Sequence, residues 1–255
     1  MVTTPAQRDR AETIWVARER ILGRIGEACA RAGRDPGAVT LLAVSKTIPA
    51  EVLRDAVAAG FNRFGENRVQ DALAKAPDVP GARWQLVGPL QGNKARKALE
   101  VFESIQSVDS VELAERLDRI VGDLRPGARY PVLLQVNVDD DPAKAGFQPG
   151  SLEAAIDRTG PLGALACLEI RGLMTIGRLV DDPEAARLTF RRLRLLSERL
   201  RGNGAPIGTD LSMGMSDDFE VAVEEGATIV RVGRALFGER QVRGDGPSGP
   251  PGGTV

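Results

Sequence analysis

The sequence predicts an α/β fold, a single (β/α)8 TIM barrel with an extra N-terminal helix. Eight short apolar runs follow one another along the chain, and each has a helical pattern before or after it. Most of these runs are apolar at successive positions, as is typical of parallel strands that are covered on both faces. The chain has 255 residues, the usual size of one such barrel. An open doubly wound sheet is the alternative, because the number of strands alone does not decide between the two.

The first element is an amphipathic helix from about Ala6 to Ala32. Its apolar residues recur at spacings of three and four, and Gly33 followed by Asp35-Pro36 is a stop signal. The predicted strands are Leu41–Lys46, Arg63–Glu66, Trp84–Gly88, Ser104–Val108, Val132–Val138, Glu169–Ile176, Asp210–Met213 and Ile229–Val232. The predicted helices between them are Ala50–Ala59, Lys94–Phe102, one that starts at the capping residue Ser110, Pro183–Arg201 and Asp217–Glu225.

Residues 1–240 are expected to form one barrel domain, and residues 241–255, rich in Gly and Pro, are expected to be disordered. No stretch approaches the roughly 18 apolar residues that cross a bilayer, so no membrane-spanning segment is expected. The N-terminal segment lacks the apolar core of an export signal. The two cysteines, Cys29 and Cys167, show neither metal-ligand nor disulfide-framework spacing. We therefore expect a cytoplasmic protein without a metal site.

Charge and residue types exclude several classes of function. A net charge of −1 gives no basic field to hold nucleic acid. The chain contains no histidine, the only side chain whose unperturbed pKa lies near neutrality. Catalytic triads with histidine, histidine-ligated metals and histidine proton shuttles are therefore excluded. Acid–base chemistry must use Lys, Asp, Glu, Cys or bound water.

The functional face of a β/α barrel is built from the loops at the carboxyl ends of its strands. Lys46 is the last residue of the first apolar run, where partial desolvation would favour the neutral amine that attacks a carbonyl. The alternative is a lysine whose stem lies along the strand end while its amine reaches water. The polar residues at the predicted strand ends are Lys46, Asn67, Gln91, Asn93, Lys94, Asn137, Lys144, Thr175, Ser216, Gly233 and Arg234.

The segments after the last two strands have the composition of a phosphate site. Gly233 would let the backbone approach an anion, and the hydroxyl and amide of Ser216 could face phosphate. The alternative is that Ser216 only caps its helix and Gly233 only eases a turn. Arg231 lies inside the last strand. It can point into the mouth toward a ligand ring nitrogen, or it can pair with Glu66 or another barrel carboxylate, and the two roles are compatible.

Eight motifs in this order resemble one known family, the pyridoxal phosphate homeostasis proteins. The resemblance runs from about Val39 to Gly238, nearly the whole folded chain. The motifs are Leu42-Ala-Val-Ser-Lys-Thr47, Phe64-Gly-Glu-Asn67-Arg-Val-Gln70, Trp84-Gln-Leu-Val-Gly-Pro-Leu-Gln-Gly-Asn-Lys94, Ser107-Val-Asp-Ser110, Leu133-Leu-Gln-Val-Asn-Val138, Arg171-Gly-Leu-Met-Thr175, Leu211-Ser-Met-Gly-Met-Ser-Asp-Asp218 and Val230-Arg-Val-Gly-Arg-Ala-Leu-Phe-Gly238.

The resemblance implies a barrel similar to the N-terminal domain of alanine racemase, without a second domain. It implies that Lys46 holds pyridoxal 5′-phosphate (PLP) as a Schiff base. It also implies that Ser216, Gly233 and the backbone at Arg234 hold the phosphate, and that Arg231 faces the pyridine nitrogen. The cofactor-binding set that we expect is Lys46, Asn67, Thr175, Ser216, Arg231, Gly233 and Arg234.

Other positions either match or depart from the family pattern. Lys144 matches a family lysine thought to act in PLP transfer or secondary binding. Family members commonly carry histidine where Gln85 and Gln106 stand, a second lysine where Ile48 stands, and threonine where Arg234 stands.

Three functions follow from these residues, and the first is a carrier that maintains the intracellular PLP (vitamin B6) pool without robust catalysis. Such a carrier would act as a monomer and would deliver PLP to apo-enzymes. The second is an amino-acid racemase or decarboxylase of low activity, with Lys46 as one base and water or Lys94 as another. The tyrosine that serves as second base in alanine racemase has no counterpart, because Tyr130 opens the fifth strand at the opposite end of the barrel. The third is a Schiff-base aldolase that acts on a phosphorylated sugar without a cofactor.

Overall fold

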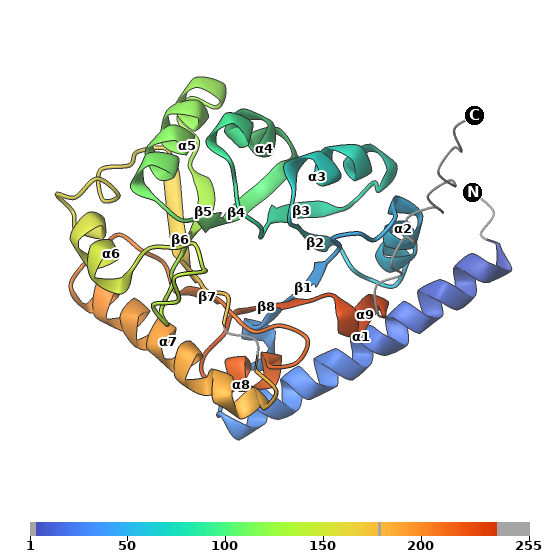
Figure 1. Cartoon of the computed structure of the whole chain (residues 1–255). Helices are drawn as coiled ribbons and strands as arrows, with labels where there is room; N and C mark the ends of the chain where they lie inside the picture. The colour runs from blue at the N-terminus through green and yellow to red at the C-terminus, as the bar shows by residue number, and fades with distance from the viewer. Residues whose placement is uncertain (1–3, 178–179, 239–255) are drawn as a thin grey trace, which may run out of the picture.

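In the computed structural model, which describes residues 4–177 and 180–238, eight parallel strands close into a barrel in the order of the sequence (Figure 1). The last strand pairs with the first through Thr40 opposite Ile229 and Ala43 opposite Val232. This closure confirms the predicted TIM barrel and rules out the open doubly wound sheet. The predicted disordered tail, residues 241–255, lies outside the described residues. The strands are β1 (Thr40–Val44), β2 (Arg63–Glu66), β3 (Arg83–Leu86), β4 (Phe102–Val108), β5 (Tyr130–Gln135), β6 (Leu168–Met174), β7 (Asp210–Ser212) and β8 (Ile229–Val232).

Helices form an outer ring around the strands (Figure 1). They are α1 (Pro5–Arg31), α2 (Ala50–Ala58), α3 (Val69–Lys75), α4 (Ala95–Val101), α5 (Val111–Leu124), α6 (Pro149–Ile156), α7 (Arg187–Gly202), α8 (Phe219–Glu224) and α9 (Arg234–Phe237). Short 3₁₀ turns are η1 (Pro36–Ala38), η2 (Ala76–Asp78), η3 (Gly92–Lys94) and η4 (Pro183–Ala186). The sequence analysis missed α3, α6 and α9, which have 7, 8 and 4 residues.

Five predicted strands end later than the strands in the structure. β1 ends at Val44 instead of Lys46, β3 at Leu86 instead of Gly88, β5 at Gln135 instead of Val138, β6 at Met174 instead of Ile176, and β7 at Ser212 instead of Met213. At β3, β5, β6 and β7 apolar residues continue beyond the strand, so the pattern does not reveal the end, whereas at β1 the residues beyond the end are the polar Ser45 and Lys46. These departing segments form the carboxyl-terminal mouth of the barrel.

The N-terminal helix α1 confirms the predicted amphipathic helix. Thr4 and Gln7 form a reciprocal capping box at its start. Its buried face contacts α2, α8 and α9, the helices that flank β1 and β8. Arg24 forms a two-bonded ion pair with Glu220 of α8, at 3.0 and 2.7 Å. The helix therefore covers the seam at which the barrel closes.

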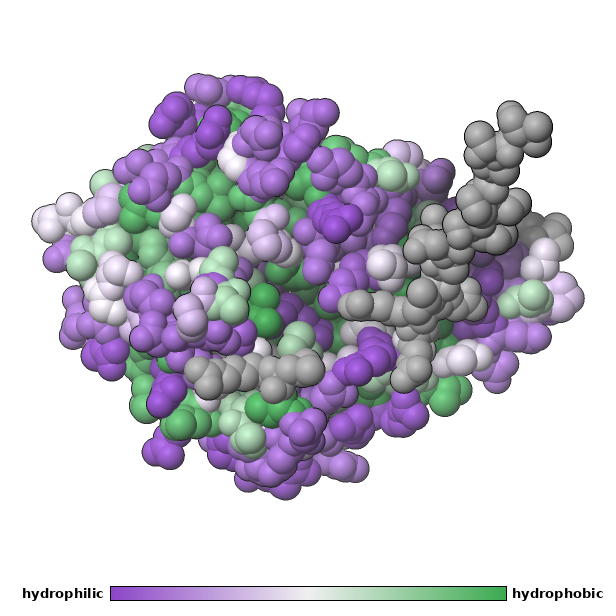
Figure 2. Space-filling view, in the orientation of Figure 1, coloured by the Kyte–Doolittle hydropathy of each residue, from purple (hydrophilic) through white to green (hydrophobic). Residues whose placement is uncertain are grey.

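The outer surface carries the polar side of these elements. On the face in Figure 2, hydrophilic side chains cover most of the surface, with hydrophobic ones in smaller groups between them. None of the described helices combines the length and the apolar character needed to span a membrane.

We predict that Ile21→Ala lowers the free energy of unfolding by about 2–4 kcal/mol, because Ile21 is fully buried where α1 meets the barrel. The matched control is Val16→Ala on the exposed side of the same helix, where a change of less than about 0.5 kcal/mol is expected. Urea denaturation of both variants measures the difference. Equal losses would contradict the packing role of this helix.

Candidate functional site

The carboxyl ends of all eight strands meet at one mouth of the barrel, since the strands are parallel. This topology brings to one end of the barrel the residues that the sequence analysis chose from separate motifs. Six of them follow β1, β2, β6, β7 or β8, and one lies inside β8. The seven are Lys46, Asn67, Thr175, Ser216, Arg231, Gly233 and Arg234.

Lys46 lies in a tight turn directly after β1. The carbonyl oxygen of Ser45 accepts hydrogen bonds from the backbone N–H of Ile48 at 3.0 Å and from Nζ of Lys75 at 2.9 Å. Thr47 has a φ of 68°, a left-handed conformation that a β-branched residue rarely adopts. A backbone held this way at a ligand mouth fixes the position from which the half-buried Lys46 side chain extends.

Glu66, the last residue of β2, is a fully buried carboxylate next to this turn. Its Oε1 accepts hydrogen bonds from Lys75 Nζ at 2.6 Å and from Ser45 Oγ at 2.8 Å. Its Oε2 has no hydrogen-bond partner among the described residues. The ion pair with Lys75 compensates the buried charge and ties α3 to the Lys46 turn. The alternative in which Arg231 pairs with Glu66 is thus wrong, because Lys75, on the unpredicted helix α3, is the partner of Glu66.

Arg231 extends from β8 into the barrel and is 5% exposed. Its Nη1 donates to Ser212 Oγ and its Nη2 donates to the carbonyl oxygen of Thr175, each at 2.8 Å. Burial lowers the pKa of Arg231 to about 10, while the charge of Asp218 opposes this shift. The guanidinium therefore stays protonated at neutral pH, although its hydrogen bonds within the described structure go to uncharged oxygens.

The loop after β7 is shaped by Asp218 and Gly214. Asp218 is buried and accepts a hydrogen bond from the N–H of Met215 at 2.6 Å, and burial raises the pKa of its carboxyl. Gly214 has a φ of 89°, and a Cβ there would meet the Cβ of Ala222 at 2.5 Å. Only glycine fits, so this loop passes close to α8 and holds Ser216 at the mouth.

Ser216 and Gly233 bring the ends of β7, β8 and β1 together. Ser216 Oγ accepts a hydrogen bond from the N–H of Ala235, in the first turn of α9, at 3.4 Å. A Cβ on Gly233 would lie 3.0 Å from the carbonyl oxygen of Val44, so glycine permits this approach. Arg234 is exposed and its side chain pairs with Asp217. The guanidinium of Arg234 is therefore engaged at the surface.

Asn67 and Thr175 complete the predicted set. Asn67 is half-buried, and its backbone packs closely on Gly88. A Cβ on residue 88 would lie 2.4 Å from the carbonyl oxygen of Asn67, so glycine permits this contact. Thr175 is buried, and its Oγ1 donates to the carbonyl oxygen of Val136 at 2.8 Å. Its main role in the structure is to orient the carbonyl that receives Arg231.

Two other predicted residues, Asn137 and Lys144, line a cavity of about 190 Å³ at the same end of the barrel. Asn137 holds the following loop through its side chain, which donates to the carbonyl oxygen of Asp141 at 2.8 Å. Lys144 donates to the carbonyl oxygen of Ile176 at 3.1 Å and pairs with Asp141 at 3.7 Å. Gln91, Asn93 and Lys94 begin η3 and α4, where the Lys94 N–H donates to the Gln91 carbonyl oxygen at 2.9 Å.

Sequence reasoning missed Lys75 and Ser212, and it did not assign Asp218 a role. Lys75 is on α3, a helix that the sequence analysis did not predict. The role of the Ser212 hydroxyl depends on its partners Gln106 and Arg231, which are distant in the sequence. The assembled mouth combines an amine that can attack a carbonyl, a hydroxyl with backbone N–H groups that can bind phosphate, and a buried guanidinium that can donate to a ligand.

Comparison with known proteins agrees with this class of barrel. The family model described as alanine racemase, N-terminal domain, matches residues 25–241. Curated pyridoxal phosphate homeostasis proteins are 44% identical over 226 residues in Pseudomonas aeruginosa and 40% identical over 224 residues in Aquifex aeolicus. Each alignment covers 87% of this chain, and 93% and 96% of those proteins respectively. The chain belongs to the family of pyridoxal phosphate homeostasis proteins.

Solved structures extend the comparison. The structure of PipY from Synechococcus elongatus PCC7942 with PLP bound has 45% sequence identity and a TM-score of 0.72, covering 84% of this chain and 100% of that chain. A protein described as unknown from Bifidobacterium adolescentis has 37% identity and a TM-score of 0.81, covering 92% of this chain and 98% of that one. Alanine racemase of Clostridium difficile 630, at 16% identity, a TM-score of 0.64 and coverage of 87% and 55%, shares the fold.

We predict that Lys75→Met lowers the free energy of unfolding by about 3–5 kcal/mol, because it leaves the buried Glu66 carboxylate without its cation. Lys97→Met, at an exposed position on α4, is the matched control and should have little effect. Adding Glu66→Gln to Lys75→Met should restore part of the loss, as measured by urea denaturation. A double variant less stable than Lys75→Met would argue against this ion pair as the cause.

Proposed function

We propose that this barrel holds PLP as a Schiff base on Lys46 and serves PLP homeostasis in the cytoplasm rather than robust catalysis. The observation that carries the proposal is the position of Lys46, half-buried in a turn that Lys75 and Ile48 hold at the mouth. The family of the chain supports it, since a relative of 45% identity is described with PLP bound.

The residues at the mouth fit the groups of PLP one by one. The Lys46 amine would bond to the aldehyde carbon with release of water. Ser216 and the backbone N–H groups of Gly233 and Arg234 would hold the phosphate. Arg231 would face the ring nitrogen, and Asn67 and Thr175 would complete the polar surround. When bound, PLP supplies an electrophilic aldehyde and a ring that can withdraw electrons.

The buried cation Arg231 supports a carrier more than a catalyst. A guanidinium that stays protonated beside the ring nitrogen would oppose protonation of that nitrogen and so weaken the ring as an electron sink. The chain also offers few acid–base groups: it has no histidine, and Tyr130 starts β5 at the amino-terminal end, donating to the carbonyl oxygen of Phe102 at 2.9 Å. Burial raises the pKa of Tyr130, so its hydroxyl stays protonated and is not available to accept a proton at neutral pH.

The carrier would act as a monomer that delivers PLP to apo-enzymes. A Schiff base at the mouth is reversible, because water returns the free amine and the aldehyde. This chemistry suits a protein that must both hold the cofactor and release it.

We predict that wild-type protein with added PLP shows the visible absorbance band of a Schiff base, and that Lys46→Ala loses it because no amine remains at that place. Borohydride reduction followed by peptide mass mapping should place the modification on Lys46. Lys144→Ala, which removes another amine at the same end of the barrel, is the control and should keep the band. A band that persists in Lys46→Ala would reject the assignment.

We predict that the PLP-loaded protein racemises or decarboxylates amino acids far more slowly than about 1 per second, the low end of ordinary enzyme turnover. Chiral chromatography of alanine and other small amino acids after incubation measures the rate. Turnover in the ordinary enzyme range would favour the alternative, a racemase or decarboxylase, over the carrier.

A further inference from the structure

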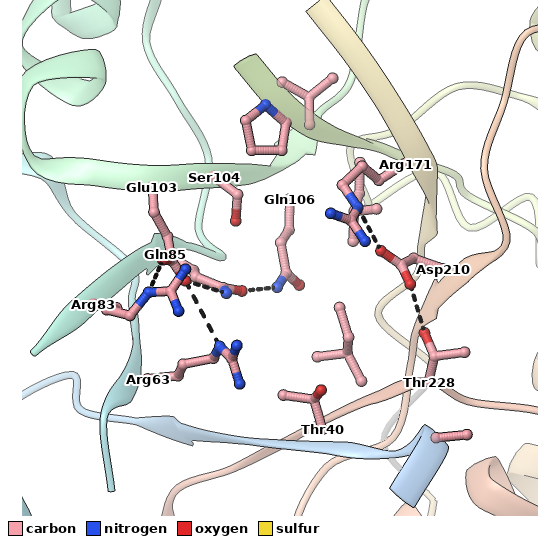
Figure 3. Close-up of a pocket in the computed structure, with 15 residues that line it drawn as sticks. Thr40, Arg63, Arg83, Gln85, Glu103, Ser104, Gln106, Arg171, Asp210 and Thr228 are labelled. Atoms are coloured by element: carbon pink, nitrogen blue, oxygen red, sulfur yellow. Dashed lines mark hydrogen bonds and ion pairs between the residues drawn. The ribbon is translucent and has the colours of Figure 1, made fainter. Parts of the chain in front are cut away.

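A cavity of about 270 Å³ lies at the amino-terminal mouth of the barrel, the end opposite Lys46. Its walls come from the first residues of the strands, and Figure 3 shows two charged groups facing each other across it. Arg63, Arg83 and Glu103 lie on one side, while Arg171 and Asp210 lie on the other. The amides of Gln85 and Gln106 also line the cavity, together with apolar residues such as Val132 and Ile229.

The two carboxylates of this pocket are already satisfied. Glu103 accepts hydrogen bonds from Arg83 Nε and, at 2.8 Å, from Gln85 Nε2. Asp210 accepts from Arg171 Nε at 3.1 Å and from Thr228 Oγ1 at 3.3 Å. The acceptors of the pocket therefore have little capacity left for a cationic ligand.

The three guanidinium groups, in contrast, have donors to spare. Arg83 and Arg171 use Nε for their carboxylates, and within the described residues their terminal Nη atoms donate no hydrogen bond. Arg63 approaches Glu103 only at 4.0 Å. The pocket thus has three cations and two carboxylates. Its guanidinium groups line a small cavity and have the planar donor geometry that binds an oxyanion.

A continuous chain of hydrogen bonds leads from this pocket to Arg231. Gln85 donates to Glu103 at 2.8 Å, Gln106 donates to Gln85 at 2.6 Å, Ser212 donates to Gln106 at 2.6 Å, and Arg231 donates to Ser212 at 2.8 Å. Every donor points the same way, from the buried cation toward the carboxylate. Hydrogen bonds aligned in one direction polarise each other, and more strongly so in an interior of low dielectric constant.

We propose that the amino-terminal pocket is a second small-molecule site that binds a small organic anion carrying a carboxylate or a phosphate, and that its occupancy alters the cofactor end of the barrel through this chain. Arg83 and Gln85 both donate to Glu103, and an anion that accepts hydrogen bonds from Arg83 would weaken the bond from Arg83 to Glu103. The bond from Gln85 then strengthens, and the change passes through Gln106 and Ser212 to Arg231. The proposal that an anion binds depends on the pocket alone, whereas the proposal that binding alters the cofactor end rests on the proposed function.

The test is isothermal titration calorimetry of the full chain with succinate and with inorganic phosphate, at constant ionic strength balanced with chloride. In the PLP-loaded protein the proposed phosphate site of the cofactor is occupied, so binding reports on another site. The response to the two probes decides whether carboxylate or phosphate is preferred. Saturable binding is expected, weakened about tenfold or more by Arg63→Gln with Arg83→Gln. Arg191→Gln, an exposed arginine on α7, is the matched control.

Absence of saturable binding by either probe, or binding unchanged by the two pocket substitutions, would overturn the site. Calorimetry on the unloaded protein applies the same comparison of variants, so it tests the pocket even if the PLP assignment fails. A protein without a PLP band that still binds succinate through Arg63 and Arg83 would contradict the proposed function and keep the pocket.

Coupling is tested by the effect of the bound anion on PLP. Succinate is expected to shift the visible band or to change the PLP dissociation constant about fivefold or more, and PLP must then change succinate affinity by the same factor. Ser212→Ala breaks the chain outside the pocket, so it should keep succinate binding and lose the coupling. Ser212→Cys, which keeps the size of the side chain but replaces the hydroxyl with a weak donor, serves as a second variant outside the pocket if the first is unstable. Binding without any effect on PLP would overturn the coupling.

Discussion

The buried positive charge of Arg231 is the constraint on which the interior of this barrel depends. A guanidinium cannot leave water without polar partners, and here they are a hydroxyl, a backbone carbonyl and the more distant Asp218. The Ser212 hydroxyl accepts a hydrogen bond from Arg231 and donates its own hydrogen to the side-chain oxygen of Gln106. One charged side chain therefore makes a polar layer necessary in a barrel that would otherwise be filled with branched apolar residues.

The second buried charge, on Glu66, is compensated in a different way. It receives a direct cation from Lys75, so its charge is compensated locally and the ion pair ties helix α3 to the turn of Lys46. Arg231 has no such hydrogen-bonded carboxylate among the described residues, and its hydrogen bonds go to Ser212 and Thr175 instead. The two charges lie on β2 and β8, either side of β1, and so they flank the lysine at its carboxyl end.

The sequence predicted what depends on local pattern and failed where geometry alone decides. Apolar runs located all eight strands, and the residues at their ends included Lys46, Ser216 and Gly233. The pattern could not show that β1 ends at Val44, because the turn that follows depends on the positive φ of Thr47. Nor could it choose the partner of Glu66, since Lys75 reaches it from an unpredicted helix. The amino-terminal pocket was not predicted, because its residues lie at the starts of separate strands and only the closed barrel brings them together.

A carrier and a catalyst place opposite demands on the same lysine. Both must hold a carbonyl compound covalently, but a catalyst must also stabilise negative charge on it and move protons to and from carbon. In the proposed site, a guanidinium protonated at neutral pH beside the ring would oppose the first requirement. A chain without histidine, with its single tyrosine buried at the far mouth, would limit the second. The same guanidinium, linked by hydrogen bonds to a second pocket, offers a route by which cofactor retention can respond to another small molecule. The features that weaken catalysis are thus the ones that make regulated holding and release physically accessible.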